Sequence, residues 1–271
     1  MRKSTLLVFP PTTRTMSATP DFDALLNDKA TSVAADLERA SEVLLVAFGG
    51  IVGELGIPVF EFFKLASDLD VKKMFVRDLR QAWYQQGLPG IADDVDGIAR
   101  YLERVVREQR VRRVVMVGNS AGGYAALLFG WMLEVDEVHA FAPQTFVDRW
   151  NRLVHWDRRW REEIAGMYRS LNSGTRYLDL AKVLPTRRVR TRSHVYYAAP
   201  MRIDRVHARR LGKVPNLELH ESPEGQHNLI KLLRASGDLR RILDDALRSA
   251  PAARRAGDGK TSPDDGYAAA R

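Results

Sequence analysis

The sequence predicts an α/β domain with a doubly wound, mostly parallel sheet of about six strands. Short apolar runs rich in β-branched or aromatic residues alternate with longer segments in which apolar residues recur at helical spacing. This alternation requires right-handed crossovers and a sheet that helices cover on both faces. The chain has 271 residues, of which 45% are hydrophobic. One buried core, and therefore one domain over residues 41–248, is expected.

The strands are expected where apolar runs are short and continuous, because parallel strands are buried on both faces. The runs are Val43–Phe48, Met74–Val76, Val114–Val117, Val138–Ala142, His194–Ala198 and Leu217–Leu219. One-faced helices are expected between them, where the spacing of apolar residues is helical in 55–66 and 91–105. The segment of about 146–190 differs, because it has no strand pattern and mixes Trp150, Trp156 and Trp160 with many arginines. It is predicted to be a helical insertion between two strands.

Both ends of the chain differ in composition from the predicted domain. Residues 1–40 are polar and interrupted by prolines, and residues 249–271 have almost no apolar periodicity, so an irregular leader and a disordered tail are expected. The apolar run Thr5–Phe9 is too short for a secretory signal, and charged residues interrupt every run that could span a bilayer. The absence of cysteine excludes disulfides and thiolate chemistry. A cytoplasmic protein without a membrane span is expected.

The net charge of +8 is concentrated in one segment, since residues 144–193 contain twelve basic and five acidic side chains, a net +7. Two interpretations remain open, a solvated helical face and a site that attracts anionic ligands. No nucleic-acid partner is expected, because the basic segment contains no recognised nucleic-acid motif.

The chemistry is indicated by a G-x-S-x-G pattern, Gly118-Asn119-Ser120-Ala121-Gly122, between a predicted strand and a predicted helix. A serine on so tight a turn needs small flanking residues, and the turn exposes its hydroxyl at the carboxyl edge of the sheet. Ser120 is therefore the predicted nucleophile. The alternative is a glycine-rich turn that packs closely or binds phosphate.

A nucleophilic serine needs a general base, and the base needs an acid to orient it. His227 follows the last predicted strand on a loop and is the predicted base, whereas His139 and His194 fall in strands, His155 in the insertion and His207 in a helix.

Asp204 follows the preceding strand and is the predicted acid, with Asp148 as a rival and Glu224 as a third candidate. The oxyanion donors are expected to be the amide of Ala121 and that of Gly49 or Gly50, after the first core strand.

These residues resemble those of the α/β-hydrolase superfamily, over about 43–247. The resemblance implies that the helical insertion is a lid and that Trp150, Trp156 and Trp160 line an apolar entrance for substrate. The two N-terminal antiparallel strands common in that family are not visible in the sequence, which implies a reduced sheet.

The predicted function is a serine hydrolase that cleaves an ester, thioester or amide through an acyl-enzyme. The expected substrate is a small molecule or a carrier-linked acyl group, and the basic segment favours one with negative charge. An acyltransferase with the same triad and a non-catalytic binding protein on this scaffold are the alternatives. No metal or organic cofactor is expected, since the sequence has neither H-E-x-x-H nor a P-loop.

Overall fold

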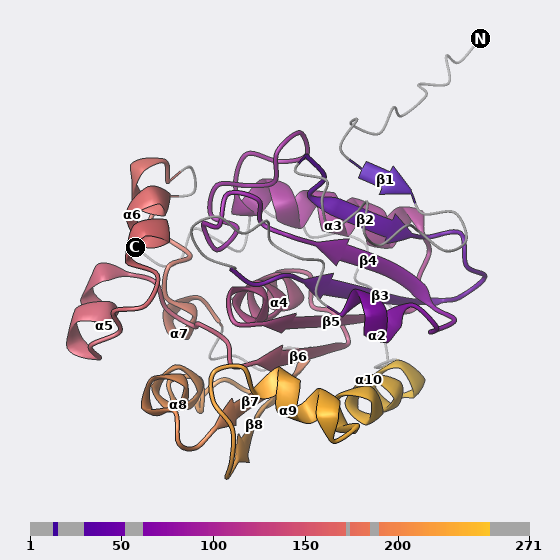
Figure 1. Cartoon of the computed structure of the whole chain (residues 1–271). Helices are drawn as coiled ribbons and strands as arrows, with labels where there is room; N and C mark the ends of the chain where they lie inside the picture. The colour runs from indigo at the N-terminus through magenta and orange to yellow at the C-terminus, as the bar shows by residue number, and fades with distance from the viewer. Residues whose placement is uncertain (1–12, 16–29, 52–61, 172–173, 185–189, 250–271) are drawn as a thin grey trace.

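An eight-stranded sheet with helices on both faces forms the centre of the described part of the chain (Figure 1). The computed structural model describes residues 13–15, 30–51, 62–171, 174–184 and 190–249. The strands are β1 (Thr13–Thr15), β2 (Val33–Asp36), β3 (Val43–Phe48), β4 (Lys72–Val76), β5 (Arg113–Asn119), β6 (Glu137–Phe141), β7 (Arg192–Ala198) and β8 (Leu217–Ser222).

The strand order is β1-β2-β4-β3-β5-β6-β7-β8. Every neighbouring pair from β4 to β8 is parallel, so the carboxyl ends of these strands meet at one edge of the sheet. The predicted fold class is confirmed, and each of the predicted apolar runs forms a strand of this parallel part.

The sheet has two more strands than the sequence predicts, and both lie in the segment that was expected to be an irregular leader. β2 runs antiparallel to β4, with Val33 opposite Val76, and β1 pairs with β2. The described sheet is therefore larger than the reduced sheet of about six strands that the sequence implies. β2 has the sequence VAAD, which is too short and too poor in β-branched residues to be recognised, and its burial comes from pairing with β4. Residues 1–12, 16–29 and 250–271 lie outside the described residues.

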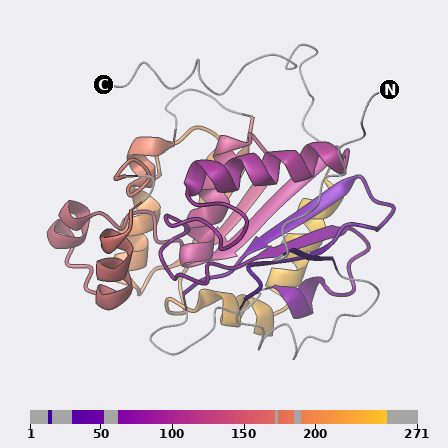
Figure 2. The same cartoon turned by 90° about the horizontal axis from the view of Figure 1, so that it is seen from above.

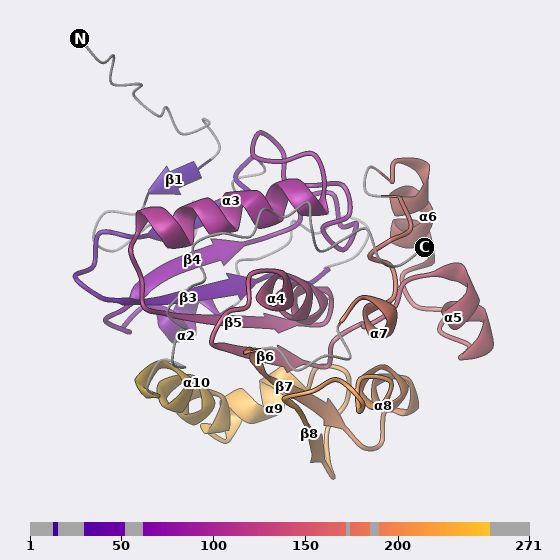
Figure 3. The same ribbon diagram turned by 180° about the vertical axis from the view of Figure 1, so that it is seen from behind.

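Helices cover both faces of the sheet (Figures 1 and 3). The apolar stripe of α3 and the largely apolar α4 pack on one face in a core that α8 also joins, while residues of α2 and α10 pack on the other. The bounds are α2 (Phe63–Ala66), α3 (Val95–Glu108), α4 (Ala121–Met132), α8 (Arg202–Arg209), α9 (Leu229–Ala235) and α10 (Asp238–Arg248). Of the helix predicted over 55–66, residues 55–61 lie outside the described residues.

The predicted insertion is helical. It contains α5 (Arg149–Val154), α6 (Arg161–Arg169) and α7 (Leu180–Val183) between β6 and β7, and these helices lie beyond the carboxyl ends of the strands (Figures 1 and 2). None of the helices in the described ranges has the length and apolar character that a membrane span requires.

Candidate active site

Ser120 lies at the junction of β5 and α4, where the chain turns sharply from strand to helix. Its backbone has φ 54° and ψ −117°, a region that non-glycine residues rarely adopt and that occurs mainly at functional sites. α4 begins at the next residue, Ala121. The first amides of a helix have no acceptor within the helix and carry partial positive charge, so the turn places the Ser120 hydroxyl beside anion-stabilising groups.

The glycines on either side of Ser120 are required by backbone packing. A Cβ atom on Gly118 would lie 2.1 Å from the Gly122 carbonyl oxygen, and one on Gly122 would lie 2.2 Å from the Phe48 carbonyl oxygen. Neither backbone oxygen can move away without breaking the turn or the end of β3. The glycine spacing of the motif therefore follows from the close approach of β5, α4 and β3.

His227 and Asp204 complete a chain of hydrogen bonds that begins at Ser120. His227 lies on the loop between β8 and α9, and its Nε2 is 3.0 Å from the Ser120 Oγ. Its Nδ1 is 2.9 and 3.0 Å from the two carboxylate oxygens of Asp204. Asp204 lies in the first turn of α8 and is buried. The structure thus brings together three predicted site residues that are up to 107 positions apart in the sequence.

Burial alone would raise the pKa of Asp204. The hydrogen bond with His227, together with the electrostatic attraction of His227 and of the Arg159 guanidinium, outweighs burial and holds this pKa below its ordinary value. The carboxylate is therefore ionised at neutral pH, in the form that orients an imidazole.

The two rival acids lie in other environments. Asp148 is the N-cap of α5, where one carboxylate oxygen accepts from the Asn151 amide at 2.9 Å and the other from the Asn151 side chain at 2.6 Å. Glu224 is exposed on the β8–α9 loop. The carboxylate that His227 contacts is that of Asp204.

Arg159 is a residue of the site that the sequence analysis did not identify. It comes from the insertion, and its Nη1 is 2.8 Å from the Asp204 Oδ1 and 3.3 Å from the His227 Nδ1. Two further bonds of 3.0 Å join its guanidinium to Asp157. No local pattern marks Arg159 among the neighbouring arginines, because its partner Asp204 is 45 residues away.

The buried side chain of His207 helps to hold Arg159 in place through Asp157. The Thr145 amide donates to the His207 Nδ1 at 3.0 Å, so Nε2 carries the proton and donates to Asp157 at 3.1 Å. Burial lowers the pKa of His207 to about 4, which keeps the ring neutral. Thr145, His207 and Asp157 therefore form a buried series of hydrogen bonds that holds Arg159 against Asp204.

The predicted oxyanion donors differ in their hydrogen bonding. The Gly49 amide donates to the Val76 carbonyl at 2.8 Å as part of the sheet, and the Gly49 carbonyl accepts from the Tyr84 hydroxyl at 2.8 Å. The Gly49 amide is thus already engaged. Of the two glycines, Gly50 is therefore the better candidate to act together with Ala121.

The three insertion tryptophans lie in different environments. Trp150 and Trp156 are each 69% exposed, whereas Trp160 packs against the main core. Trp156 lines a pocket of about 490 Å³ together with Asp157, Arg158, Arg159, Met201, Arg202 and Ile203. Of the three tryptophans, only Trp156 contributes to this pocket, which it shares with the site residue Arg159.

Comparisons with known proteins find structural relatives only. No protein-family model and no curated protein sequence matches the chain. A capsule O-acetyltransferase of Neisseria meningitidis serogroup A is similar in structure with a TM-score of 0.60 and 12% identity, over 80% of this chain and 91% of that one.

Two esterases are also similar in structure. Brefeldin A esterase, a bacterial homologue of human hormone-sensitive lipase, has a TM-score of 0.51 and 16% identity over 78% of this chain and 69% of its own. A thermophilic esterase from the Planctomycetes species Thermogutta terrifontis has a TM-score of 0.50 and 14% identity over 81% and 85% of the two chains. Together with the strand order and the strand–serine–helix turn, these similarities show that the chain has the fold of the α/β-hydrolase superfamily.

Proposed function

We propose that this chain is a serine hydrolase that cleaves an ester, thioester or amide through an acyl-enzyme on Ser120. The observation that carries the proposal is the continuous hydrogen-bonded series from the Ser120 Oγ through His227 to Asp204, with distances of 3.0 and 2.9 Å. A nucleophile, a base and an orienting acid within hydrogen-bond reach are what acyl transfer by serine requires.

The proposed reaction begins with His227 protonated on Nδ1, which donates to Asp204. The free Nε2 accepts the Ser120 proton as Oγ attacks the acyl carbon, and the amides of Ala121 and Gly50 donate to the oxyanion that forms. His227 then transfers the proton from Nε2 to the leaving group, which departs. Water, activated by the same imidazole, attacks the acyl-enzyme and releases the acid and the Ser120 hydroxyl.

The pocket beside the site favours an acyl substrate with negative charge. Arg158 and Arg202 line it together with the indole of Trp156, beside Arg159, whose guanidinium is already paired with Asp157 and Asp204. The adjoining pocket adds Arg152 and Arg161. Guanidinium groups bind carboxylates and phosphates with directed hydrogen bonds. An anionic small molecule or an acyl group on an anionic carrier is therefore the proposed substrate class.

The test is active-site labelling combined with turnover. A fluorophosphonate probe should label the purified protein, and a panel of p-nitrophenyl esters and acyl thioesters should include a substrate. Ser120→Ala should abolish labelling and reduce kcat by at least ~10³-fold. Ser67→Ala, which changes an exposed serine at the end of α2, is the matched control and should leave both unchanged. Absence of labelling in the folded wild-type protein would favour a non-catalytic binding protein instead.

An acyltransferase is the second candidate, supported by the similarity to the capsule O-acetyltransferase, which has also been solved in complex with CoA. The acyl-enzyme would then react with an alcohol instead of water. Measuring ester product against free acid while the concentration of a sugar alcohol is raised distinguishes the two, since a hydrolase continues to release mainly the acid.

A further inference from the structure

Histidines and glutamates gather on one face of the last three strands, outside the Ser120 site. His139 of β6 is in register with His194 of β7, which is in register with Glu218 of β8. Side chains two residues apart on a strand point to the same face. The face that carries His139 and His194 therefore also carries His220, two positions after Glu218.

Three atoms of this cluster have the spacing of ligands to a single metal ion. The His194 Nδ1 is 3.0 Å from the His220 Nε2 and 3.6 Å from the Glu218 Oε2, and the last two are 3.8 Å apart. Ligands about 2.1 Å from a tetrahedral zinc ion are about 3.4 Å from one another. The distances of 3.0, 3.6 and 3.8 Å between the three atoms lie on both sides of this value. Small side-chain rotations would therefore bring all three atoms to the spacing of zinc ligands.

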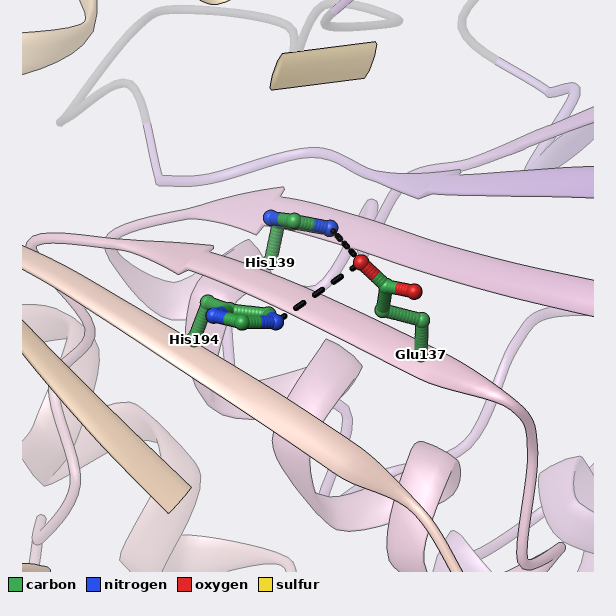
Figure 4. A group of neighbouring side chains, drawn as sticks. All are labelled: Glu137, His139 and His194. Atoms are coloured by element: carbon green, nitrogen blue, oxygen red, sulfur yellow. Dashed lines mark hydrogen bonds and ion pairs between the residues drawn. The ribbon is translucent and has the colours of Figure 1, made fainter. Parts of the chain in front are cut away.

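A second trio in the cluster, Glu137, His139 and His194, fits an ion less well (Figure 4). The rings of His139 and His194 are stacked, with an angle of 13° between their planes, so their nitrogen lone pairs do not converge well. One Glu137 oxygen is also occupied by Arg113 at 2.6 Å and by Arg192 at 2.9 Å. Two cations on the carboxylate oppose the binding of a third.

Glu137 instead has the position of an outer partner of the first trio. Figure 4 shows its other oxygen facing both rings, and this oxygen is 3.6 Å from the His194 Nε2. Metal-binding histidines usually donate their second ring N–H to a carboxylate, which fixes the tautomer. At 3.6 Å this contact is electrostatic and not a hydrogen bond, and the same oxygen is 3.0 Å from the His139 Nε2. The nearby carboxylate favours the His194 proton on Nε2, which leaves the Nδ1 lone pair for Glu218 and His220.

The exposure of this trio agrees with metal binding. Glu218 is 70% and His220 39% exposed in their side chains, so an ion can reach the site from solvent.

We propose that the His194 Nδ1, the Glu218 Oε2 and the His220 Nε2 bind a divalent transition-metal ion of the zinc class, with water in the fourth position. Two imidazoles and one carboxylate favour such an ion over magnesium or calcium, which prefer oxygen ligands. β8 is the last strand of the sheet. The ion would join this edge strand to β7 and stabilise their pairing.

The experiment is titration of the chelator-treated full-length protein with Co²⁺, followed by its visible absorption, and with Zn²⁺ by calorimetry. One equivalent of each should bind, and Co²⁺ should give the intense bands of a four-coordinate site. Glu218→Gln and His220→Gln should each weaken binding by more than the roughly 10- to 100-fold loss typical of outer-partner mutations. His155→Gln, which changes a histidine of the insertion, is the control and should bind as the wild type does.

Urea unfolding without metal checks that each variant is folded, and added Zn²⁺ should raise the unfolding midpoint of the wild type and His155→Gln only. No binding to the folded wild-type protein, or unchanged binding in His220→Gln, would overturn the proposal. Loss of binding in His139→Gln with retention in His220→Gln would also overturn it, by assigning the ion to the second trio.

Discussion

Among the single residues of the site, Arg159 connects the insertion to the proposed catalytic pair. It contacts the carboxylate of Asp204 and is held on its other side by Asp157. Burial opposes the charged guanidinium, but the two carboxylates outweigh burial and raise the pKa of Arg159. Arg159 thus provides a fixed positive charge beside Asp204, and we assign it the role of a positioning residue.

Arg159→Gln should reduce kcat/KM by about tenfold, which corresponds to ~1.4 kcal/mol, with most of the effect in kcat. Removing this cation favours the protonated form of the Asp204–His227 pair. The acid limb of the pH profile of kcat/KM should therefore move to higher pH, which a purely structural role would not cause.

The matched control is Arg169→Gln, on the exposed end of α6, which should leave the rate and the pH profile unchanged. An unshifted acid limb in a folded Arg159→Gln protein would contradict the positioning role.

Among the elements, the turn from β5 to α4 depends most on its glycines. β3, β5 and α4 approach one another so closely that the backbone oxygens of Phe48 and Gly122 occupy the space where Cβ atoms would lie. The positive φ of Ser120 is maintained by this packing. The strain at Ser120 is therefore stabilised by the parallel core strands around it.

Gly118→Ala should lower the free energy of unfolding by roughly 2–4 kcal/mol, because its Cβ would overlap backbone that cannot move. Any folded protein should also lose fluorophosphonate labelling, since the turn that positions Ser120 beside His227 must shift.

Gly166→Ala in α6 is the matched control, with the nearest atom 3.4 Å from the added Cβ at the end of the Arg169 side chain. It should be neutral or stabilise by about 0.5–1 kcal/mol through helix propensity. Urea denaturation measures both variants, and equal stabilities would show that the turn tolerates a side chain at Gly118.

At the scale of the whole molecule, part of the positive charge of the basic segment 144–193 is used internally. Arg159, Arg190 and Arg192 pair with carboxylates of the described chain. Arg158 and Arg202 remain at the pocket next to the site. The internal ion pairs correspond to neither interpretation of the basic segment, whereas the pocket arginines support the anionic-substrate proposal.

If these arginines attract substrate, kcat/KM for an ester carrying a carboxylate should fall about tenfold between roughly 20 and 300 mM NaCl. A neutral ester of the same chain length should show no such fall, and Arg158→Gln should weaken the salt dependence for the anionic ester. The release of p-nitrophenol measures kcat/KM for the wild type with each ester and for Arg158→Gln with the anionic ester. Salt-independent turnover of both esters would exclude the anionic preference.

Several features of the fold and site were predictable because their signals are local. The core strands of the parallel sheet appear as short apolar runs, and the turn at Ser120 has a glycine pattern that close packing requires. β2 was missed because a four-residue strand rich in alanine acquires its structure from its partner β4. The sequence analysis expected no metal because it found no H-E-x-x-H spacing, which is a helical pattern. Glu218 and His220 are two residues apart on a strand, a spacing that this motif does not cover.

By itself, the sequence determined the α/β class, the strand–serine–helix junction and the chain order of Ser120, Asp204 and His227, because period and turn chemistry depend on residues close in the chain. Only the tertiary structure decided that Asp204 rather than Asp148 contacts His227, that the Gly49 amide belongs to the sheet, and that Arg159 reaches the site. It alone also showed that His194 meets Glu218 and His220. The physical reason is that these contacts depend on strand register and on the docking of the insertion, which are set by the packing of distant segments and leave no mark in local spacing.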